Sequence, residues 1–266
     1  MIRIIEIESK SNPRIKEYRK LMDKRERRIK GLFLVEGFRM VQEAFKAGMD
    51  VRAVVYDSRE VEQLQRYLGS YLASGSLELI ASNPEVIRQL SSTETPQGVV
   101  AVIADSRKVP EAKGLIIYLD RLQDPGNVGT IIRSAHAGGA SRVILGKGSV
   151  DPYSEKALRS SMGSIFHMPV TLDGDDELER LAAEGIPLAV TSLEADRSIY
   201  SVDLTVDMIL VIGNEGNGVS PELMDRATIL LRIPMPGNAE SLNASVAASV
   251  IIFERVRQIG ESKKQE

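Results

Sequence analysis

Three segments of the chain combine glycine, asparagine and a few charged side chains directly after apolar runs. They are LDRLQDPGNVGTIIR at 119–133, VIGNEGNGVS at 211–220 and RIPMPGNAESLNASVAASV at 232–250. Glycine lets a ligand approach the backbone closely, and asparagine suits tight turns whose polar groups project outward. A single segment of this kind would be read as an ordinary turn. Three with the same character predict one shared binding site.

The second segment limits what that site can bind. A phosphate-binding loop would end in Gly-Lys-Ser/Thr, but here three glycines surround Glu215, and no lysine occurs between Lys156 and Lys263. The glycines at 213, 216 and 218 also miss the dinucleotide pattern G-x-G-x-x-G, which disfavours a nucleotide-dependent oxidoreductase. Because a carboxylate would repel a triphosphate, we expect a ligand that is neutral or cationic at its centre.

Composition excludes several other chemistries. The 266 residues include no cysteine and only two histidines, His136 and His167, so disulfides, thiolate metal sites and histidine-rich metal clusters are excluded. We expect no metal, and we interpret both histidines as structural. No apolar run approaches the roughly 20 residues that cross a bilayer, and the N-terminus lacks the apolar core of a signal peptide. We therefore expect a cytoplasmic protein with no membrane partner.

The net charge of −3 conceals a basic segment near the N-terminus. Between Lys10 and Lys30 there are ten basic and three acidic residues, a local charge of +7. Asn12-Pro13 is a typical helix start and Gly31 a typical stop, so we predict a helix over 12–30. This helix is either a solvated face or a surface that contacts RNA phosphates. For the second alternative we select Arg14, Arg19, Lys24 and Arg28.

The elements that must position these residues alternate in type. Short β-rich runs alternate with helical patterns in the first part of the chain and predict a small α/β domain over residues 1–106. The alternation restarts after the polar stretch 105–114 and ends in an apolar helix at 241–258. It predicts a second α/β domain over residues 107–266 with a mostly parallel sheet, whose ligands bind at the carboxyl ends of the strands. The three glycine-containing segments follow such strands.

The same segments carry three ordered motifs. They are N-x-G-x-x-x-R from Asn127 to Arg133, G-N-E-G-x-G at 213–218 and I-P-M-x-G-x-x-x-S-L-N at 233–243. In this order they resemble the motifs of the SpoU (TrmH) family of S-adenosylmethionine-dependent RNA 2′-O-ribose methyltransferases. The segment from Asn12 to Phe45 similarly resembles the small substrate-binding domain that many members carry.

The resemblance implies a function and further features of the fold. It implies an enzyme that transfers a methyl group from S-adenosylmethionine to a ribose 2′-hydroxyl of RNA. It also implies a homodimer whose catalytic domain ends in a deep trefoil knot, a threading that no general rule of chain connection would suggest. The appended domain favours ribosomal RNA over tRNA as the substrate. A tRNA 2′-O-methyltransferase and a non-catalytic RNA-binding or ribosome-assembly protein on the same scaffold stay open as alternatives.

The resemblance also implies roles for individual residues. The cofactor would lie against Thr191, Gly213, Ile233 and Leu242, and the catalytic group would comprise Arg133, Asn127, Glu215, Ser241 and Asn243. Family members are often given an arginine base, but a guanidinium resists deprotonation, so we expect Arg133 to hold a phosphate and orient the hydroxyl. We expect Glu215 to be an organiser and Asn127 to lie in the loop ahead of its helix. Asn127 could instead only form a turn, and Ser241 could only cap the last helix.

Overall fold

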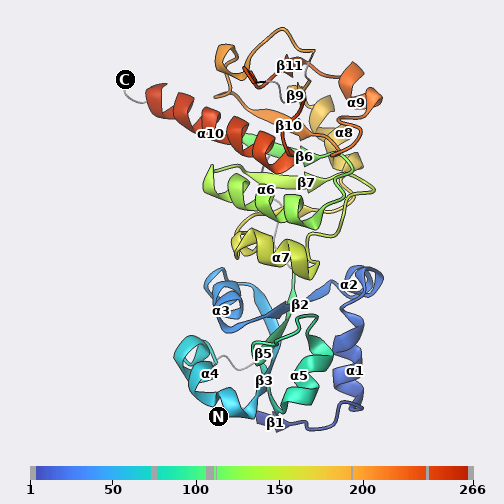
Figure 1. The fold of residues 1–266 in the computed structure, drawn as a ribbon, viewed down its shortest axis with the longest axis vertical. Coiled ribbons are helices and arrows are strands. Elements are labelled where there is room, and N and C mark those ends of the chain that lie inside the picture. Colours follow the sequence, from blue (N-terminus) through green and yellow to red (C-terminus); the bar gives the residue numbers. More distant parts are fainter. Residues whose placement is uncertain are drawn as a thin grey trace. The chain divides into compact units, whose positions relative to one another are not determined.

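The computed structural model describes residues 4–72, 77–105, 111, 113–192, 194–237 and 240–262. The chain forms two compact units, one from Met1–Arg107 with Tyr153–Leu158 and the other from Lys108–Pro152 with Arg159–Glu266. The predicted domain boundary at residues 106 and 107 lies outside the described residues. Each unit is built around its own sheet (Figure 1).

The first unit contains a mixed sheet with the strand order β1-β4-β3-β5-β2. Strands β1, β4 and β3 are parallel to one another, whereas β5 is antiparallel to both β3 and β2. Helix α1 packs with α5, and α3 packs with α4, so that the two pairs cover opposite faces of the sheet (Figure 1). The strands are β1 (Ile4–Glu6), β2 (Leu32–Glu36), β3 (Asp50–Asp57), β4 (Glu78–Ser82) and β5 (Val99–Ala104). The helices are α1 (Pro13–Lys20), α2 (Lys24–Lys30), α3 (Phe38–Lys46), α4 (Val61–Leu68) and α5 (Pro84–Leu90), with a 3₁₀ turn at Ser58–Glu60.

The predicted single helix over 12–30 is wrong, because the chain breaks between α1 and α2. Leu21 is buried against Ala53 and Val102 of the sheet, which draws the chain inward at that point. Asp23 then starts a new helix, since its carboxylate accepts hydrogen bonds from the backbone N–H groups of Arg25 at 2.8 Å and Glu26 at 3.2 Å. Such a side chain supplies an acceptor for helix N–H groups that otherwise lack one.

The second unit contains a fully parallel sheet with the order β11-β9-β10-β6-β7-β8. This confirms the predicted α/β fold with a mostly parallel sheet, whereas the knot stays a prediction. The strands are β6 (Leu115–Leu119), β7 (Arg142–Leu145), β8 (Val170–Thr171), β9 (Leu188–Thr191), β10 (Met208–Ile212) and β11 (Ile229–Leu231). The helices are α6 (Pro125–Ala137), α8 (Asp175–Ala183), α9 (Pro221–Asp225) and α10 (Ala244–Ser262), with 3₁₀ turns at Ser164–Phe166 and Ile199–Ser201. Helix α7 (Glu155–Ser161) is divided, because its residues up to Leu158 belong to the first unit.

The central strands explain why the three glycine-containing segments meet. Every residue of β6 and β10 is buried, as expected for parallel strands covered on both faces. These strands are neighbours and end in register, with Leu119 opposite Ile212. Strands β9 and β11 continue the sheet beyond β10. The loops after β6, β10 and β11 therefore leave the same edge of the sheet.

Helix α10 packs against α6 and also contacts the 3₁₀ turn at Ile199–Ser201. The hydroxyl oxygens of Ser134 and Ser249 lie 2.7 Å apart, and a Cβ at Gly138 would come within 2.1 Å of the Ile252 side chain. Helix α10 is the apolar helix that the sequence predicts at 241–258, and its buried residues are Ser245, Ala248, Ile251, Ile252, Glu254 and Arg255. Its outward side exposes three large apolar side chains, Val246, Phe253 and Val256. Among the described residues, no helix has the length and apolar character required to cross a membrane.

Candidate cofactor and RNA site

A cavity of about 350 Å³ opens at the carboxyl ends of β9, β10 and β11. All four residues predicted to bind the cofactor line it, namely Thr191, Gly213, Ile233 and Leu242. Ligand pockets of roughly 300 to 1,000 Å³ are the usual size for cofactors and drug-sized molecules. The structure thus brings the four together, and their contact with a cofactor stays a prediction.

The loop between β10 and α9 forms one wall of this cavity and is closed by its own hydrogen bonds. Asn214 and Gly218 exchange both backbone N–H···O bonds at 2.9 Å. The Asn214 side-chain oxygen accepts from the N–H groups of Gly216 at 2.9 Å and Asn217 at 3.2 Å. A Cβ at Gly213 would lie 2.3 Å from backbone atoms of Gly218 and Val219. Glycine at 213 is therefore required by the loop itself as well as suited to a close ligand.

Glu215 connects this loop to the start of α6. Its carboxylate accepts hydrogen bonds from the backbone N–H groups of Gln123 and Asp124, both at 3.2 Å, and from the Asn127 side-chain amide at 3.0 Å. Desolvation acts to raise the pKa of Glu215, but these donors outweigh it and leave the pKa below its ordinary value. The side chain is therefore an ionised acceptor at neutral pH, as an organising group should be.

Asn127 links Glu215 to the last helix. Its side-chain oxygen accepts a hydrogen bond from the Asn243 amide at 3.0 Å, and its own amide donates to Glu215. The expectation that Asn127 lies in a loop is wrong, because it is a buried residue in the first turn of α6. The helix begins earlier since Asp124 caps it, accepting from the Gly126 N–H at 3.0 Å, and Pro125 occupies its first position.

Asn243 is the cap of α10. Its side-chain oxygen accepts from the backbone N–H groups of Ser245 at 2.9 Å and Val246 at 3.3 Å. The alternative of Ser241 as the cap is wrong, because Ser241 precedes the helix and lines the cavity instead. Glu215, Asn127 and Asn243 thus form a continuous chain of hydrogen bonds that joins all three motifs.

Arg133 is the one predicted catalytic residue that neither joins this chain of hydrogen bonds nor lines the cavity. It is exposed on α6 and is not among the residues that line the cavity. Within the described part of the chain, its guanidinium has no ion pair or hydrogen-bond partner. The side chain is therefore accessible to a large ligand from outside.

Comparison with known proteins places this arrangement in a family. The model of the SpoU rRNA Methylase family matches residues 114–253, and that of the MRM3-like substrate binding domain matches residues 12–101. The chain belongs to the SpoU rRNA methylase family. This confirms the predicted family and the resemblance of the N-terminal segment to a substrate-binding domain.

Relatives of the SpoU chain match it over nearly its full length. The 23S rRNA (guanosine(2553)-2′-O)-methyltransferase RlmP of Bacillus subtilis is 33% identical, over 93% of this chain and 98% of the relative. The 23S rRNA (uridine(2479)-2′-O)-methyltransferase of Streptomyces viridochromogenes is 35% identical, over 93% and 90%. The crystal structure of the SpoU methyltransferase AviRb from Streptomyces viridochromogenes, in complex with AdoMet, superposes with a TM-score of 0.84 at 33% identity. It covers 93% of this chain and 98% of that one.

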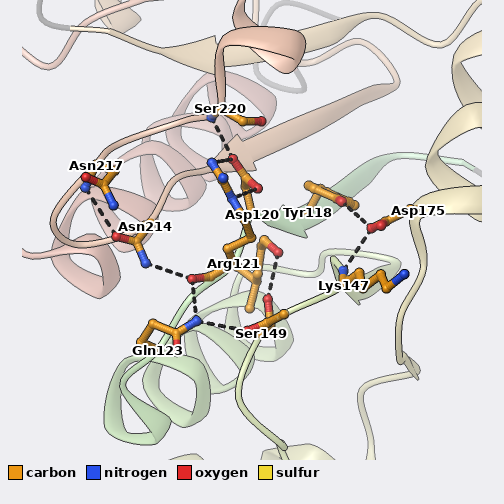
Figure 2. A network of polar contacts seen from close by, with 12 residues as sticks. Tyr118, Asp120, Arg121, Gln123, Lys147, Ser149, Asp175, Asn214, Asn217 and Ser220 are labelled. Carbon is orange, nitrogen blue, oxygen red and sulfur yellow. Dashed lines mark hydrogen bonds and ion pairs between the residues drawn. The ribbon is translucent and has the colours of Figure 1, made fainter.

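Sequence reasoning missed a second polar network, which links the loop after β10 of this SpoU domain to the end of β6. The buried carboxylate of Asp120 accepts from the Ser220 N–H at 2.7 Å and from Arg121 Nε at 3.0 Å. The Arg121 carbonyl accepts from the side-chain amides of Asn214 at 2.8 Å and Gln123 at 3.0 Å. Figure 2 shows these contacts between the end of β6 and both ends of the loop. The signal that could have revealed them is the Asp-Arg pair directly after a wholly apolar strand.

The four predicted RNA-binding residues lie on α1 and α2 of the first unit. Arg19, Lys24 and Arg28 are exposed, whereas the Arg14 guanidinium lies 3.4 Å from the Glu78 carboxylate and is partly buried. Their contact with RNA stays a prediction. His136 and His167 stack with ring centroids 5.0 Å apart and an interplanar angle of 1°, and their interpretation as structural residues also stays a prediction.

Proposed function

We propose that the protein transfers a methyl group from S-adenosylmethionine to a ribose 2′-hydroxyl of ribosomal RNA. The observation that carries the proposal is the hydrogen-bonded chain from Glu215 through Asn127 to Asn243 beside the cavity. It ties the three family motifs into one site. The relatives named above act on 23S rRNA, which supports ribosomal RNA over tRNA.

The residues around the cavity fit S-adenosylmethionine. The aliphatic side chains of Ile233 and Leu242 line it together with backbone of the Gly213 loop, a combination that suits an adenine ring read through backbone groups. The wall also carries the ionised Glu215, which a cationic ligand tolerates. When bound, the cofactor supplies a methyl group activated by its attachment to a positively charged sulfur.

The remaining tasks fall to side chains of this chain. Methyl transfer from sulfonium to a hydroxyl neutralises charge and depends chiefly on alignment of the reacting atoms in a site that excludes water. The exposed Arg133 holds a phosphate of the RNA and thereby orients the 2′-hydroxyl. Asn127 and Asn243 keep the motif segments in register, and Ser241, at the cavity, is placed to contact the incoming nucleotide. These roles are part of the proposal.

The proposal includes two statements on the state of the protein. The exposed apolar side of α10, formed by Val246, Phe253 and Val256, supports a homodimer, because apolar stripes of this kind mark protein interfaces. A ribosomal RNA substrate supports a cytoplasmic location.

The test compares methyl transfer with cofactor binding. We expect the wild-type protein to transfer labelled methyl from S-adenosylmethionine to ribosomal RNA of a strain that lacks the gene. The Arg133→Ala variant should keep cofactor affinity within about twofold by calorimetry but lose at least about 100-fold in transfer, since alignment alone can contribute factors of this size. Arg180→Ala on α8, whose arginine is exposed and paired to Glu177 and Glu184, is the matched control and should transfer normally.

Two outcomes would contradict the proposal in different ways. Normal transfer by Arg133→Ala would remove the role given to that residue. Cofactor-bound wild-type protein that methylates no ribosomal RNA would favour the non-catalytic RNA-binding alternative. If the wild-type protein does methylate ribosomal RNA, the modified nucleotide is mapped by the resistance of 2′-O-methylated RNA to alkaline cleavage.

A further inference from the structure

Helix α2 turns polar side chains inward and exposes its only large apolar one. None of its seven residues is buried, and Ile29 is 67% exposed, the highest value among the exposed large apolar side chains of the described residues. A surface helix ordinarily turns its apolar residues toward the core. The sequence KRERRIK of α2 therefore requires an explanation other than packing within the chain.

The inward side of α2 explains some of its basic residues. Arg27 Nη1 donates to the backbone carbonyls of Leu21 and Met22, both at 2.8 Å, and so satisfies acceptors left open where α1 ends. Lys30 Nζ lies 2.6 Å from the Glu17 carboxylate of α1. Arg27 and Lys30 thus attach α2 to α1 and have a structural role within the unit.

The outward side carries the other basic residues together with Ile29. At about 100° per residue, Lys24, Arg28, Arg25 and Ile29 follow one another around a single arc of the helix. All four are exposed, whereas Glu26, Arg27 and Lys30 on the opposite arc are partly buried. Arg25 and Ile29 are four residues apart and so are direct neighbours on the helix surface. The outward face of α2 therefore consists of three cationic side chains, Lys24, Arg25 and Arg28, beside Ile29.

The positive charge of the outward face of α2 indicates which kind of molecule binds there. Three cations repel a second copy of the same face and attract a polyanion, so RNA is favoured over self-association. A fully paired A-form helix offers phosphates and 2′-hydroxyls but buries its base faces, whereas loops and bulges present unstacked bases. An exposed isoleucine finds an apolar surface only in the second kind of RNA.

We propose that the outward face of α2 binds unpaired RNA, with an unstacked base packed against Ile29 and the flanking phosphates held by Lys24, Arg25 and Arg28. This inference rests on the proposed RNA substrate and adds the structural class of RNA that the first unit selects. The phosphate contacts provide affinity that depends on salt. Ile29 provides discrimination between unpaired and paired RNA, which does not depend on salt.

The experiment uses the full chain and two RNA probes with the same number of phosphates. One is a stem-loop with an unpaired loop and the other a fully paired duplex, and binding is measured by fluorescence anisotropy at several salt concentrations. Ile29→Ala should weaken stem-loop binding on the order of tenfold, leave duplex binding unchanged and keep the salt dependence. Arg25→Ser should weaken both probes and lower the slope of log K against log salt by roughly 0.7 to 0.9.

The matched control is Val61→Ala, because Val61 is 45% exposed on α4 of the same unit and away from the basic helices. It should bind both probes as the wild type does. The circular dichroism spectrum and melting curve of every variant should also match those of the wild type. Ile29→Gln provides a second substitution with the same expectation as Ile29→Ala.

Two results would overturn the inference. One is stem-loop binding of both Ile29 variants at wild-type affinity, which would leave Ile29 to a protein partner. The other is an equal loss on the stem-loop and the duplex. Because the assay measures binding alone, a protein that discriminates the probes yet transfers no methyl group would sink the proposed function and keep this inference.

Discussion

Substitution of Gly213 tests the proposed cofactor site, because the structure shows which atoms a side chain at this position would contact. A Cβ built at Gly213 would lie 2.3 Å from the Gly218 carbonyl carbon, 2.3 Å from the Val219 nitrogen and 2.6 Å from the Gly218 oxygen. All three are backbone atoms, so no side-chain rotation relieves the contact. Since ordinary van der Waals contact begins near 3.4 Å, the loop must move by about 1 Å in Gly213→Ala.

A movement of this size would be felt at the cavity, because the same loop residues line it. The loop is also fastened to β6 and α6 through Asp120 and Glu215, so a shift strains those hydrogen bonds. We expect Gly213→Ala to weaken S-adenosylmethionine binding at least tenfold, or about 1.4 kcal/mol. Calorimetric titration measures the affinity, and a melting curve shows that the variant is folded.

Gly216→Ala provides the control within the same loop. Its Cβ would meet only the Asn214 side-chain oxygen, at 3.6 Å, which is an ordinary contact. We expect its cofactor affinity to stay within about twofold of the wild type. If folded Gly213→Ala binds the cofactor as tightly as Gly216→Ala does, the cavity beside this loop is not the cofactor site.

Two further predictions concern α10. Asn243→Ala should lower the free energy of unfolding by about 1 to 2 kcal/mol in urea titrations, because it removes a helix cap and leaves the Asn127 oxygen without its donor; an unchanged midpoint would refute this. Light scattering should give twice the chain mass of 29.2 kDa for the wild type and the single-chain mass for Phe253→Glu, which places a charge on the exposed apolar side; a monomeric wild type would contradict the proposed dimer.

Local sequence signals predicted much of the fold, and some such signals were overlooked. Continuous apolar runs correctly predicted β6 and β10, since buried parallel strands need little else. Asp23 with Glu26 is a capping pattern, and Asp124-Pro125 is a helix start of the same kind as Asn12-Pro13. Reading the first would have separated α1 from α2. Reading the second would have placed Asn127 inside α6.

Other features depend on contacts that spacing along the chain does not reveal. Asn127 bonds to Glu215 and Asn243 across 88 and 116 residues, so only the fold decides which atoms meet. The motifs indicated that these residues belong to one site, but not which of them donates to which. The burial of Leu21 against the first sheet is equally invisible to helix propensity. The polar contact between Asp120 and Ser220 likewise joins residues that are 100 positions apart in the sequence and belong to no motif.

The hydrogen-bonded chain has one direction, from the Asn243 amide to Asn127 and from the Asn127 amide to the Glu215 carboxylate. Its first member, Asn243, caps the first turn of α10, and its last member, Glu215, belongs to the loop after β10. In the proposed function the cofactor contacts this loop and a second subunit packs on α10, so the hydrogen bonds connect the two binding events. By thermodynamic linkage the two events favour each other by the same factor. Cofactor binding would then strengthen subunit association, and dimerisation would raise the affinity for the cofactor by the same factor.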